Sequence, residues 1–231
     1  MSSPFFNFDD VSGGYGGGMV VHGVSASVNK GEALFVLGRN GVGKSTLLKL
    51  LYGFLPLKSG KIIFDGQETT GREPASLSHL GISYCPQERM VFDGLSVLEN
   101  LSLMRQSRDV GHLAPYFERF PIIEERLSQR AGTLSGGERK ILSFVRALSE
   151  DKALILIDEP TEGVQRENVS HIADLISNRK ETGTTFVIVE QNLDLVDAVS
   201  DHVLVLDQGR TMLCERRTSI SHVDIQNYLG V

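Results

Sequence analysis

Residues 32–45 read EALFVLGRNGVGKS, and the fold class can be inferred from them. Its first part, Glu32–Leu37, is apolar enough to form a buried β-strand. A glycine-rich loop follows, and an amphipathic helix is predicted from about Gly43 to Tyr52. A strand, a loop and a helix in that order open a βαβ unit. We therefore expect an α/β fold with this loop at the end of a core strand.

The loop Gly38–Ser45 satisfies the phosphate-loop pattern G-x-x-x-x-G-K-[ST]. Glycines let the backbone turn tightly and aim N–H groups at a phosphate, and the following helix presents its positive end. Lys44 is expected to reach the β- and γ-phosphates of a nucleotide, and Ser45 to offer its hydroxyl to Mg²⁺. A chance match in a chain of this length has a probability of roughly 1%. The predicted nucleotide-binding residues of the loop are Gly38, Asn40, Gly41, Gly43, Lys44, Ser45 and Thr46.

A pair of acids follows a second apolar strand, Ala153–Ile157, which ends in Asp158-Glu159. An acid at the carboxyl end of a parallel core strand lies beside the crevice where α/β sheets bind ligands. Asp158 is predicted to hold Mg²⁺ through a water molecule, and Glu159 to polarise the attacking water as a general base. Alone, such a pair is as often a solvated strand end, but the phosphate loop upstream favours the functional interpretation.

Strands and helices alternate through the rest of the chain, which predicts a mostly parallel sheet covered on both faces. Phe5–Val28 and Lys61–Asp65 read as an antiparallel β edge region, and the segment from there to Gly81 reads as a polar connection. The pattern turns helical from about Phe92 to Arg130, with a polar joint at Gln106–Gly111. We expect one domain, with a P-loop NTPase core formed by residues 1–86 and 134–231 and an inserted helical subdomain of about 87–133.

Composition limits the classes of function. The chain has 231 residues, 41% apolar and 23% charged, enough for one large α/β domain. A net charge of −6 argues against a protein that grips nucleic acid through phosphates. No run approaches the roughly 18 apolar residues that cross a bilayer, so work at a membrane requires a partner that spans it. Two cysteines, Cys85 and Cys214, indicate no disulfide framework and fit a reducing cytosolic location.

The segment Leu134-Ser135-Gly136-Gly137-Glu138 opens a helix, and on its own it is a plausible helix N-cap. Between the phosphate loop and the acid pair, however, it resembles the LSGGQ-type signature of ABC ATPases. The resemblance covers essentially the whole chain. It implies an ATPase whose hydrolysis of ATP is coupled to solute transport, with ATP and Mg²⁺ as cofactors.

Further residues resemble family positions. Tyr15 is similar to the aromatic residue that stacks on adenine, and Gln87 to the glutamine that reaches Mg²⁺ and marks the permease junction. The resemblance implies two ATPase subunits that face each other head to tail. Ser135, Gly136 and Gly137 of each would then cap the ATP held by the other.

The resemblance also implies partners and a location. These are membrane permease subunits, a second ATPase subunit and, indirectly, a solute-binding protein, with no nucleic acid. The chain is expected in the cytoplasm, held peripherally on the inner face of the cell membrane through the permease. The apolar residues Met90–Phe92 have two interpretations, which are core packing of the helical subdomain and a groove that receives the permease.

Two departures narrow the family. Gln191 stands where most members carry a histidine that contacts the γ-phosphate, and residues 162–165 read EGVQ where S-x-L-D is usual. Together, V-E-Q-N and E-G-x-Q resemble the ATPases of branched-chain amino acid importers and of the related urea and short-amide importers. Such importers usually pair two different ATPase chains. E-G-x-Q leans to urea or amides, but Arg166 stands where that pattern usually has proline.

Other functions fit less well. An ABC-type ATPase acting on DNA would place long coiled coils between Gln87 and Ser135, and no run of heptads there is long enough for one. One acting on ribosomes generally carries two ATPase domains, and this chain has room for one. A P-loop kinase or GTPase would leave the signature without a task, and an inert binding module would not need both Lys44 and Glu159.

Overall fold

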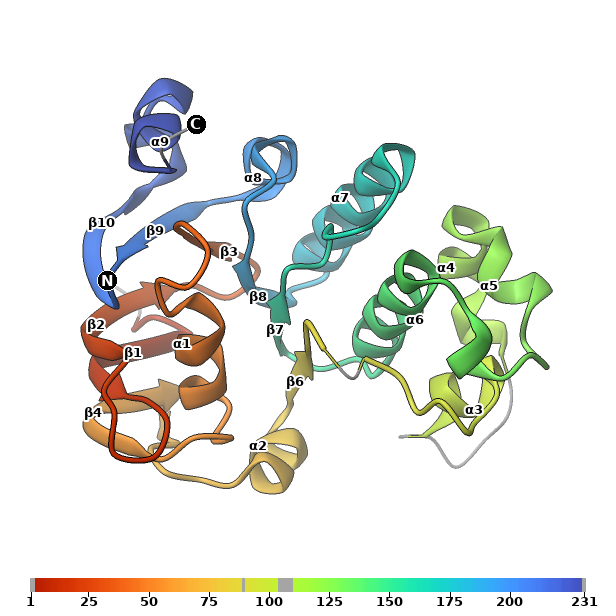
Figure 1. The fold of residues 1–231 in the computed structure, drawn as a ribbon, viewed down its shortest axis with the longest axis horizontal. Coiled ribbons are helices and arrows are strands. Elements are labelled where there is room, and N and C mark those ends of the chain that lie inside the picture. Colours follow the sequence, from red (N-terminus) through yellow and green to blue (C-terminus); the bar gives the residue numbers. More distant parts are fainter. Residues whose placement is uncertain (1–2, 89, 104–109, 230–231) are drawn as a thin grey trace.

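The computed structural model describes residues 3–88, 90–103 and 110–229, and its strands form two β-sheets (Figure 1). The larger sheet has the strand order β10-β9-β3-β8-β7-β6. Its strands are β3 (Ala33–Leu37), β6 (Ile82–Cys85), β7 (Leu154–Asp158), β8 (Thr185–Val189), β9 (His202–Asp207) and β10 (Arg210–Arg216). The smaller sheet consists of β2 (Val21–Val28), β1 (Phe6–Gly13), β4 (Leu57–Phe64) and β5 (Gln67–Glu68), in that order.

The predicted α/β class, with a mostly parallel sheet and an antiparallel region, is confirmed. All neighbours in the larger sheet pair in parallel except β9 and β10, and the smaller sheet is antiparallel throughout. Every residue of β3, β7 and β8 is buried, as expected for strands covered on both faces. Alternate side chains of β3 therefore enter different cores, with Phe35 on one face of the sheet and Leu34 and Val36 on the other.

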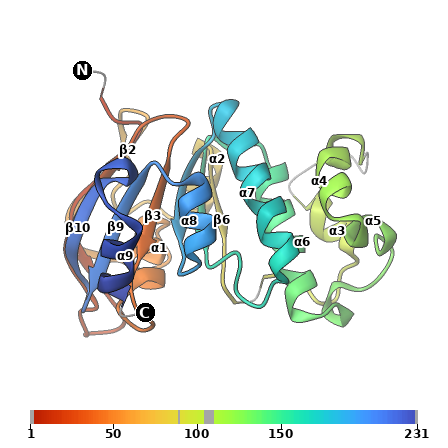
Figure 2. The same cartoon turned by 90° about the horizontal axis from the view of Figure 1, so that it is seen from above.

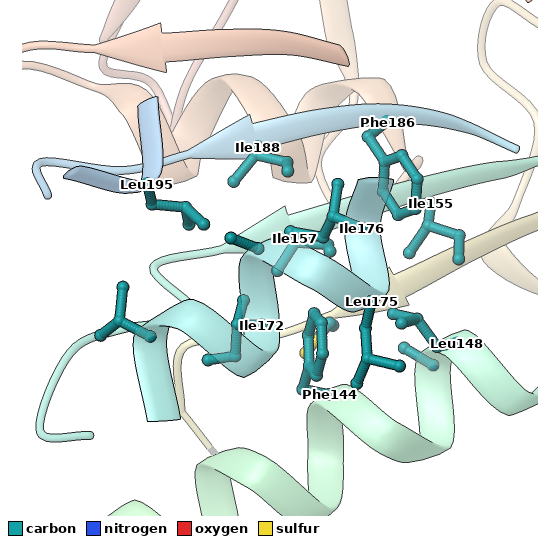
Figure 3. Close-up of a cluster of buried hydrophobic side chains, with 14 of the residues drawn as sticks. Phe144, Leu148, Ile155, Ile157, Ile172, Leu175, Ile176, Phe186, Ile188 and Leu195 are labelled. Carbon is teal, nitrogen blue, oxygen red and sulfur yellow. The ribbon is translucent and has the colours of Figure 1, made fainter. Parts of the chain in front are cut away.

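Three helices cover one face of the larger sheet. They are α6 (Gly136–Ser149), α7 (Arg166–Glu181) and α8 (Leu193–Val199). Figure 3 shows Phe144 and Leu148 of α6 and Ile172 and Ile176 of α7 in one cluster with side chains of β7 and β8. Apolar residues at helical spacing place one stripe of each helix against the sheet. This packing holds the start of α6 in a fixed position relative to the strand ends.

Helix α1 (Lys44–Leu51) covers the other face. Leu47, Leu48 and Leu50 share a buried cluster with Leu34 of β3 and Phe8 of β1, so α1 packs against both sheets. The antiparallel sheet thus closes the side of the core that the three helices leave open. Both ends of the phosphate loop are anchored, one by β3 and the other by α1.

Short helices α3 (Val97–Ser102), α4 (Ala114–Arg119) and α5 (Pro121–Glu125) lie beyond α6 and α7, on the side away from the antiparallel sheet (Figure 2). Helical structure is therefore present in the stretch predicted to be helical. Of the polar joint predicted at Gln106–Gly111, residues 106–109 lie outside the described residues. Among the described residues, no helix has the length and apolar character needed to cross a bilayer.

The prediction of a polar connection before Gly81 was wrong. It contains β5 and the helix α2 (Pro74–Leu80), which begins with proline at its first position and ends at Gly81 in a left-handed conformation. These are ordinary start and stop signals. Only Leu77 of α2 is buried, so the helix lacks the apolar periodicity on which the prediction relied. The edge strand β10 was not predicted, because most of its residues are exposed.

Candidate functional site

Four parallel strands end at one edge of the larger sheet, and the predicted site residues follow those ends. Gly38 directly follows β3, Gln87 comes shortly after β6, and Asp158 is the last residue of β7. Gln191 is the second residue after the end of β8. Because carboxyl ends of parallel strands meet at one edge, the fold brings together segments that are far apart in sequence. A cleft of about 250 Å³ opens there. Its lining residues are Val20, Asn40, Gly41, Gly43, Lys44, Ser45, Thr46, Gln87 and Glu159.

Lys44 is buried at the base of this cleft. Its Nζ donates hydrogen bonds to the carbonyl oxygens of Gly38 (2.8 Å) and Arg39 (3.1 Å) and lies 3.7 Å from Glu159 Oε1. Burial lowers the pKa of Lys44, and the charges of Glu159 and Asp158 oppose this shift. The ammonium group is therefore held by the loop itself, with an acid beside it.

The turn between β9 and β10 braces the phosphate loop. Gly209 N donates to the carbonyl of Val42 in the loop (2.8 Å), and Gly209 O accepts from His22 N in β2 (2.8 Å). Gly209 has φ +71°, and a Cβ added there would lie 1.8 Å from Val20 O. Only glycine fits this close backbone contact. The C-terminal part of the chain thus shapes a site whose motif lies near the N-terminus.

Asp158 and Ser45 form a direct pair. Ser45 Oγ donates to Asp158 Oδ1 (2.9 Å), and Tyr84 Oη donates to Asp158 Oδ2 (3.5 Å). Burial raises the pKa of Asp158 to about 6, the Ser45 hydrogen bond opposes the shift and the charge of Glu159 adds to it. A cation beside this carboxylate would favour its charged form.

The donors at this point fit a magnesium ion. Mg²⁺ prefers oxygen ligands and is usually held by one or two carboxylates together with phosphates and water. The Ser45 hydroxyl and the Asp158 carboxylate lie together, and Gln87 offers a carboxamide oxygen nearby. No cluster of three His, Cys, Asp or Glu is found within the part of the chain that the structure describes. A nucleotide-bound Mg²⁺ does not require one.

Glu159 is the centre of a hydrogen-bonded network. Its Oε2 accepts from Gln87 Nε2 (2.7 Å), and its Oε1 accepts from Gln191 Nε2 (3.2 Å). Gln191 Nε2 also donates to Asn40 Oδ1 (2.7 Å), and Gln87 Nε2 donates to Glu162 Oε2 (3.1 Å). The structure therefore brings together Glu159 with both predicted glutamines and with the phosphate loop. A carboxylate held by two amide donors is suited to accept a proton from water between them and the phosphate loop.

Glu190 is a buried residue of the site for which the sequence predicted no role. Its side chain is buried and accepts hydrogen bonds from Thr161 and from the backbone N–H groups of Gln191 and Asn192. The available signal was an acid directly after a largely apolar strand, one position beyond Val189, which pairs with Asp158 of β7. The neighbouring Gln191 was predicted as a site residue because it departs from a family pattern, and Glu190 shows no such departure.

The signature residues lie in a different cleft. Ser135 and Glu138 form a capping box at the start of α6, with Ser135 N donating to Glu138 Oε2 (2.8 Å) and Glu138 N donating to Ser135 Oγ (3.3 Å). The backbone N–H of Ser135 lowers the pKa of Glu138. Ser135 and Gly137 line a cleft of about 530 Å³ that shares no lining residue with the phosphate cleft. Within one chain, the structure does not join Ser135, Gly136 and Gly137 to the phosphate loop.

Tyr15 lies beside α1. Tyr15 is 49% exposed, and its Oη accepts a hydrogen bond from Lys49 Nζ (3.2 Å). The ammonium of Lys49 lies 5.8 Å from the centre of the tyrosine ring. Among the described residues, Tyr15 does not line the phosphate cleft. The exposed ring is accessible to a base, and the adenine contact stays a prediction.

Comparison with known proteins gives consistent matches. A family model described as "ABC transporter" matches residues 21–162. The chain is 37% identical over 211 residues to the high-affinity branched-chain amino acid transport ATP-binding protein BraG of Pseudomonas aeruginosa, covering 90% of this chain and 91% of BraG. It is 34% identical over 227 residues to the lipopolysaccharide export system ATP-binding protein LptB of Escherichia coli, covering 94% and 93%.

A solved structure shares the fold. It is a nucleotide-free ATP-binding cassette from an ABC transporter, with a TM-score of 0.80 and 28% identity. The alignment covers 99% of this chain and 96% of the other. The similarity therefore extends over both sheets and over the short helices α3, α4 and α5.

Proposed function

This chain belongs to the ABC transporter family of ATP-binding proteins, and on that premise we propose that it drives an importer for branched-chain amino acids. It is an ATPase of a transporter. The importer assignment is supported above all by 37% identity over nine-tenths of the chain to BraG, whose name states branched-chain amino acid transport. The segment 189–192, VEQN, resembles the ATPases of the same importers.

The network around Glu159 supports its role as general base. In our proposal Lys44 and the backbone of Gly38–Gly43 bind the phosphates, and Glu159 accepts a proton from the attacking water. Gln87 and Gln191 hold the two oxygens of the carboxylate, which orients it toward the phosphate loop. Tyr15 stacks on the adenine. Thr46, which also lines the cleft, contributes to phosphate binding through the first turn of α1.

Magnesium belongs to the same proposal. Ser45 and Asp158 would hold the ion, with Gln87 as a further oxygen donor, and the ion would neutralise charge on the phosphates. Its positive charge would favour the ionised form of Asp158. The chain's own contribution is a hydroxyl and a carboxylate that already lie 2.9 Å apart.

Hydrolysis requires two chains in this proposal. The signature residues Ser135 and Gly137 line a cleft separate from the phosphate cleft, and this supports the binding of a nucleotide held by a second subunit at Ser135, Gly136 and Gly137. Their backbone N–H groups at the start of α6 are suited to a phosphate. The second subunit is a different ATPase chain, as in the importers that this sequence resembles. Residues of about 87–133 form a helical subdomain that presents the signature.

An aromatic surface supports docking of the permease. Tyr52, Phe54 and Tyr84 form a cluster with ring centroids 5.1–5.2 Å apart, beside a cleft of about 650 Å³ that Arg146 also lines. Phe92 is 56% exposed, and the Arg146 guanidinium lies 5.7 Å from its ring centre. A helical segment of the permease fits this surface, because exposed aromatic patches mark partner sites. The chain would then lie on the cytoplasmic face of the membrane, and a solute-binding protein would act from the other side.

Phe92→Ala tests the docking surface. The variant is expected to uncouple solute transport while the soluble chain keeps its ATPase activity, because Phe92 does not line the phosphate cleft. Equal transport by the parent and the variant would place the docking surface elsewhere. Glu118→Ala, a change at an exposed residue of α4, is the control.

The Glu159→Gln variant tests the motor. Removing the general base should trap ATP and stabilise the closed pair of subunits, which light scattering would detect. The chain would be measured alone and mixed with candidate partner ATPases. A dimer that forms only with a second chain agrees with the heteromeric importer. A dimer formed by this chain alone contradicts the pairing of two different subunits.

The cargo is tested by competition. Radiolabelled leucine would be measured as it enters vesicles that contain the complete transporter, in the presence of excess valine, urea or acetamide. Competition by valine alone supports the branched-chain amino acid importer. Uptake of radiolabelled urea or acetamide in place of leucine supports the urea or short-amide alternative, for which the segment 162–165, EGVQ, is the favouring observation. No leucine uptake would contradict the amino acid cargo and leave the ATPase assignment unchanged.

A further inference from the structure

We propose that Glu190 is a positioning residue that fixes Gln191 against Glu159 and links it to the segment after the acid pair. The residue is only 3% exposed, and its carboxylate accepts four hydrogen bonds. Two come from Thr161, one from its backbone N (3.0 Å) and a shorter one from its hydroxyl, both to Oε1. The other two come from the backbone N of Gln191 (2.5 Å) and Asn192 (2.9 Å), both to Oε2.

Four donors meeting one buried side chain require a carboxylate. An ionised carboxylate accepts hydrogen bonds at both oxygens, whereas a carboxamide has one oxygen and an NH₂ group that only donates. In Glu190→Gln, the NH₂ group would face either the N–H groups of Gln191 and Asn192 or both donors of Thr161. In the first arrangement two buried backbone donors would lose their acceptor; in the second only the backbone N–H of Thr161 would, because the threonine hydroxyl can turn to accept from the NH₂ group. Either arrangement destabilises the local geometry. The site is therefore built around the charged group.

The position of Gln191 follows from this anchor. Its backbone N is held by Glu190 Oε2, and its Nε2 reaches Asn40 Oδ1 (2.7 Å) and Glu159 Oε1 (3.2 Å). Asn192, held by the same carboxylate oxygen, caps α8 by accepting from Leu195 N (3.3 Å). Without the anchor, the turn between β8 and α8 has freedom to move the carboxamide of Gln191 away from the general base.

The other oxygen of Glu190 fixes the segment after the acid pair. Thr161 lies two residues beyond Glu159, and its carbonyl accepts from Val164 N (3.1 Å) in the turn that follows. Within this turn, Gly163 O lies where a Cβ on Gly137 would come within 2.8 Å, so the turn packs closely on the start of α6. The Glu190 carboxylate therefore connects two parts of the structure. One is the contact between Gln191 and the phosphate loop, and the other is the turn that packs beside the signature residues.

This inference rests on the proposed role of Gln191, and the test separates the two. ATP hydrolysis would be measured in the complete transporter at saturating ATP for Glu190→Gln, Gln191→Ala and the double variant. Thr161→Val removes only the hydroxyl that donates to Glu190, and Thr161→Ser retains it. Asp194→Asn, the same acid-to-amide change at an exposed position of α8, is the matched control. Thermal unfolding and ATP binding by each variant report on folding and on the phosphate loop.

Glu190→Gln is expected to lower kcat about tenfold or more with little change in KM, because displacement of a positioned group by 1 Å can reduce the rate about 100-fold. In the Gln191→Ala background the same change should have little further effect, since the two residues act as one unit. Thr161→Val should lower kcat in the same direction, and Thr161→Ser should restore it.

Three results would overturn the inference. One is that the effects of Glu190→Gln and Gln191→Ala multiply as independent changes do. Another is a rise in KM with unchanged kcat. The third is a large effect of Glu190→Gln when Gln191→Ala has none, which would also remove the proposed role of Gln191 while leaving the ATPase and importer proposals untouched. If Glu190→Gln fails to fold, the comparison of Thr161→Val with Thr161→Ser in both Gln191 backgrounds decides the question.

Discussion

The variant Gly209→Ala should destabilise the protein far more than the same change at another glycine of similar conformation. Gly209 has φ +71° and Gly66 has φ +73°, so a Cβ at either position meets similar backbone strain of about 1–2 kcal/mol. At Gly66 nothing lies within 4 Å of an added Cβ, whereas at Gly209 the carbonyl oxygen of Val20 would lie at 1.8 Å. Gly66→Ala is therefore a control for the strain alone.

The additional effect at Gly209 comes from the contact that must open. To relieve it, the turn has to move away from Val20, and this breaks the hydrogen bonds of Gly209 with Val42 and His22. Each broken bond contributes about 1 kcal/mol. We expect Gly209→Ala to lower the free energy of unfolding by about 3–4 kcal/mol and Gly66→Ala by about 1–2 kcal/mol. The first is a large part of the stability of a typical domain, about 5–15 kcal/mol.

Urea unfolding followed by circular dichroism would measure both variants. With a slope of about 2–3 kcal/mol per molar urea, the midpoint should fall by roughly 1–2 M for Gly209→Ala and by roughly 0.3–1 M for Gly66→Ala. Because Gly209 N donates to Val42 O, the first variant should also bind ATP more weakly, and the second should bind as the parent does. Equal midpoint shifts for the two variants would refute the argument from the close contact.

Three further predictions concern the site. Gln191→His should give the ATPase rate a new pH inflection near about 6.5, where an ordinary histidine titrates, and identical pH–rate profiles for the parent and the variant would contradict this. Glu138→Ala should cost about 1 kcal/mol of stability at pH 7 through loss of the capping box. Because the pKa of Glu138 in the folded protein lies below 4.5, this difference in stability should be present above pH 4.5 and be lost as the pH falls through the folded pKa. Thermal unfolding at pH 7 and pH 3 measures the difference. An equal difference at both pH values would exclude the capping role. Tyr15→Ala should weaken ATP binding about tenfold by calorimetry, since stacking on a base contributes about 1–3 kcal/mol, and should leave inorganic triphosphate binding unchanged. Parallel losses for both ligands would remove the adenine contact.

Much of the fold could be predicted because its core strands are apolar throughout and its functional segments follow them. The strands before Gly38, Asp158 and Gln191 were all recognised from short apolar runs, and the structure has β3, β7 and β8 there. Elements with little burial gave no such signal. Helix α2 has one buried residue and β10 is mostly exposed, so periodicity could not reveal either.

The site divides in the same way. Lys44, Ser45, Asp158 and Glu159 were predicted from motifs whose spacing is set by the phosphate chemistry, and the fold brings Lys44 to Glu159 and Ser45 to Asp158. The brace at Gly209 and the anchor at Glu190 could not be predicted. Each depends on partners distant in sequence, and a single sequence does not say which glycine or which buried acid will meet them.

The place of β3 in the sheet has a consequence for synthesis of the protein. Its two neighbours are β8 and β9, at Thr185–Val189 and His202–Asp207. In a nascent chain, the strand that precedes the phosphate loop therefore has no partner in this sheet until β8 has left the ribosome, and it lacks its second partner until β9 has. Such distant pairings form slowly, because a long loop must close before they can contribute. A ribosome-bound chain stopped before His202 would contain the whole stretch Gly38–Ser45 and still lack one neighbour of β3 and the turn that braces Val42. Nucleotide can therefore stabilise only late folding intermediates, and its binding during translation would mark the moment at which the sheet is completed.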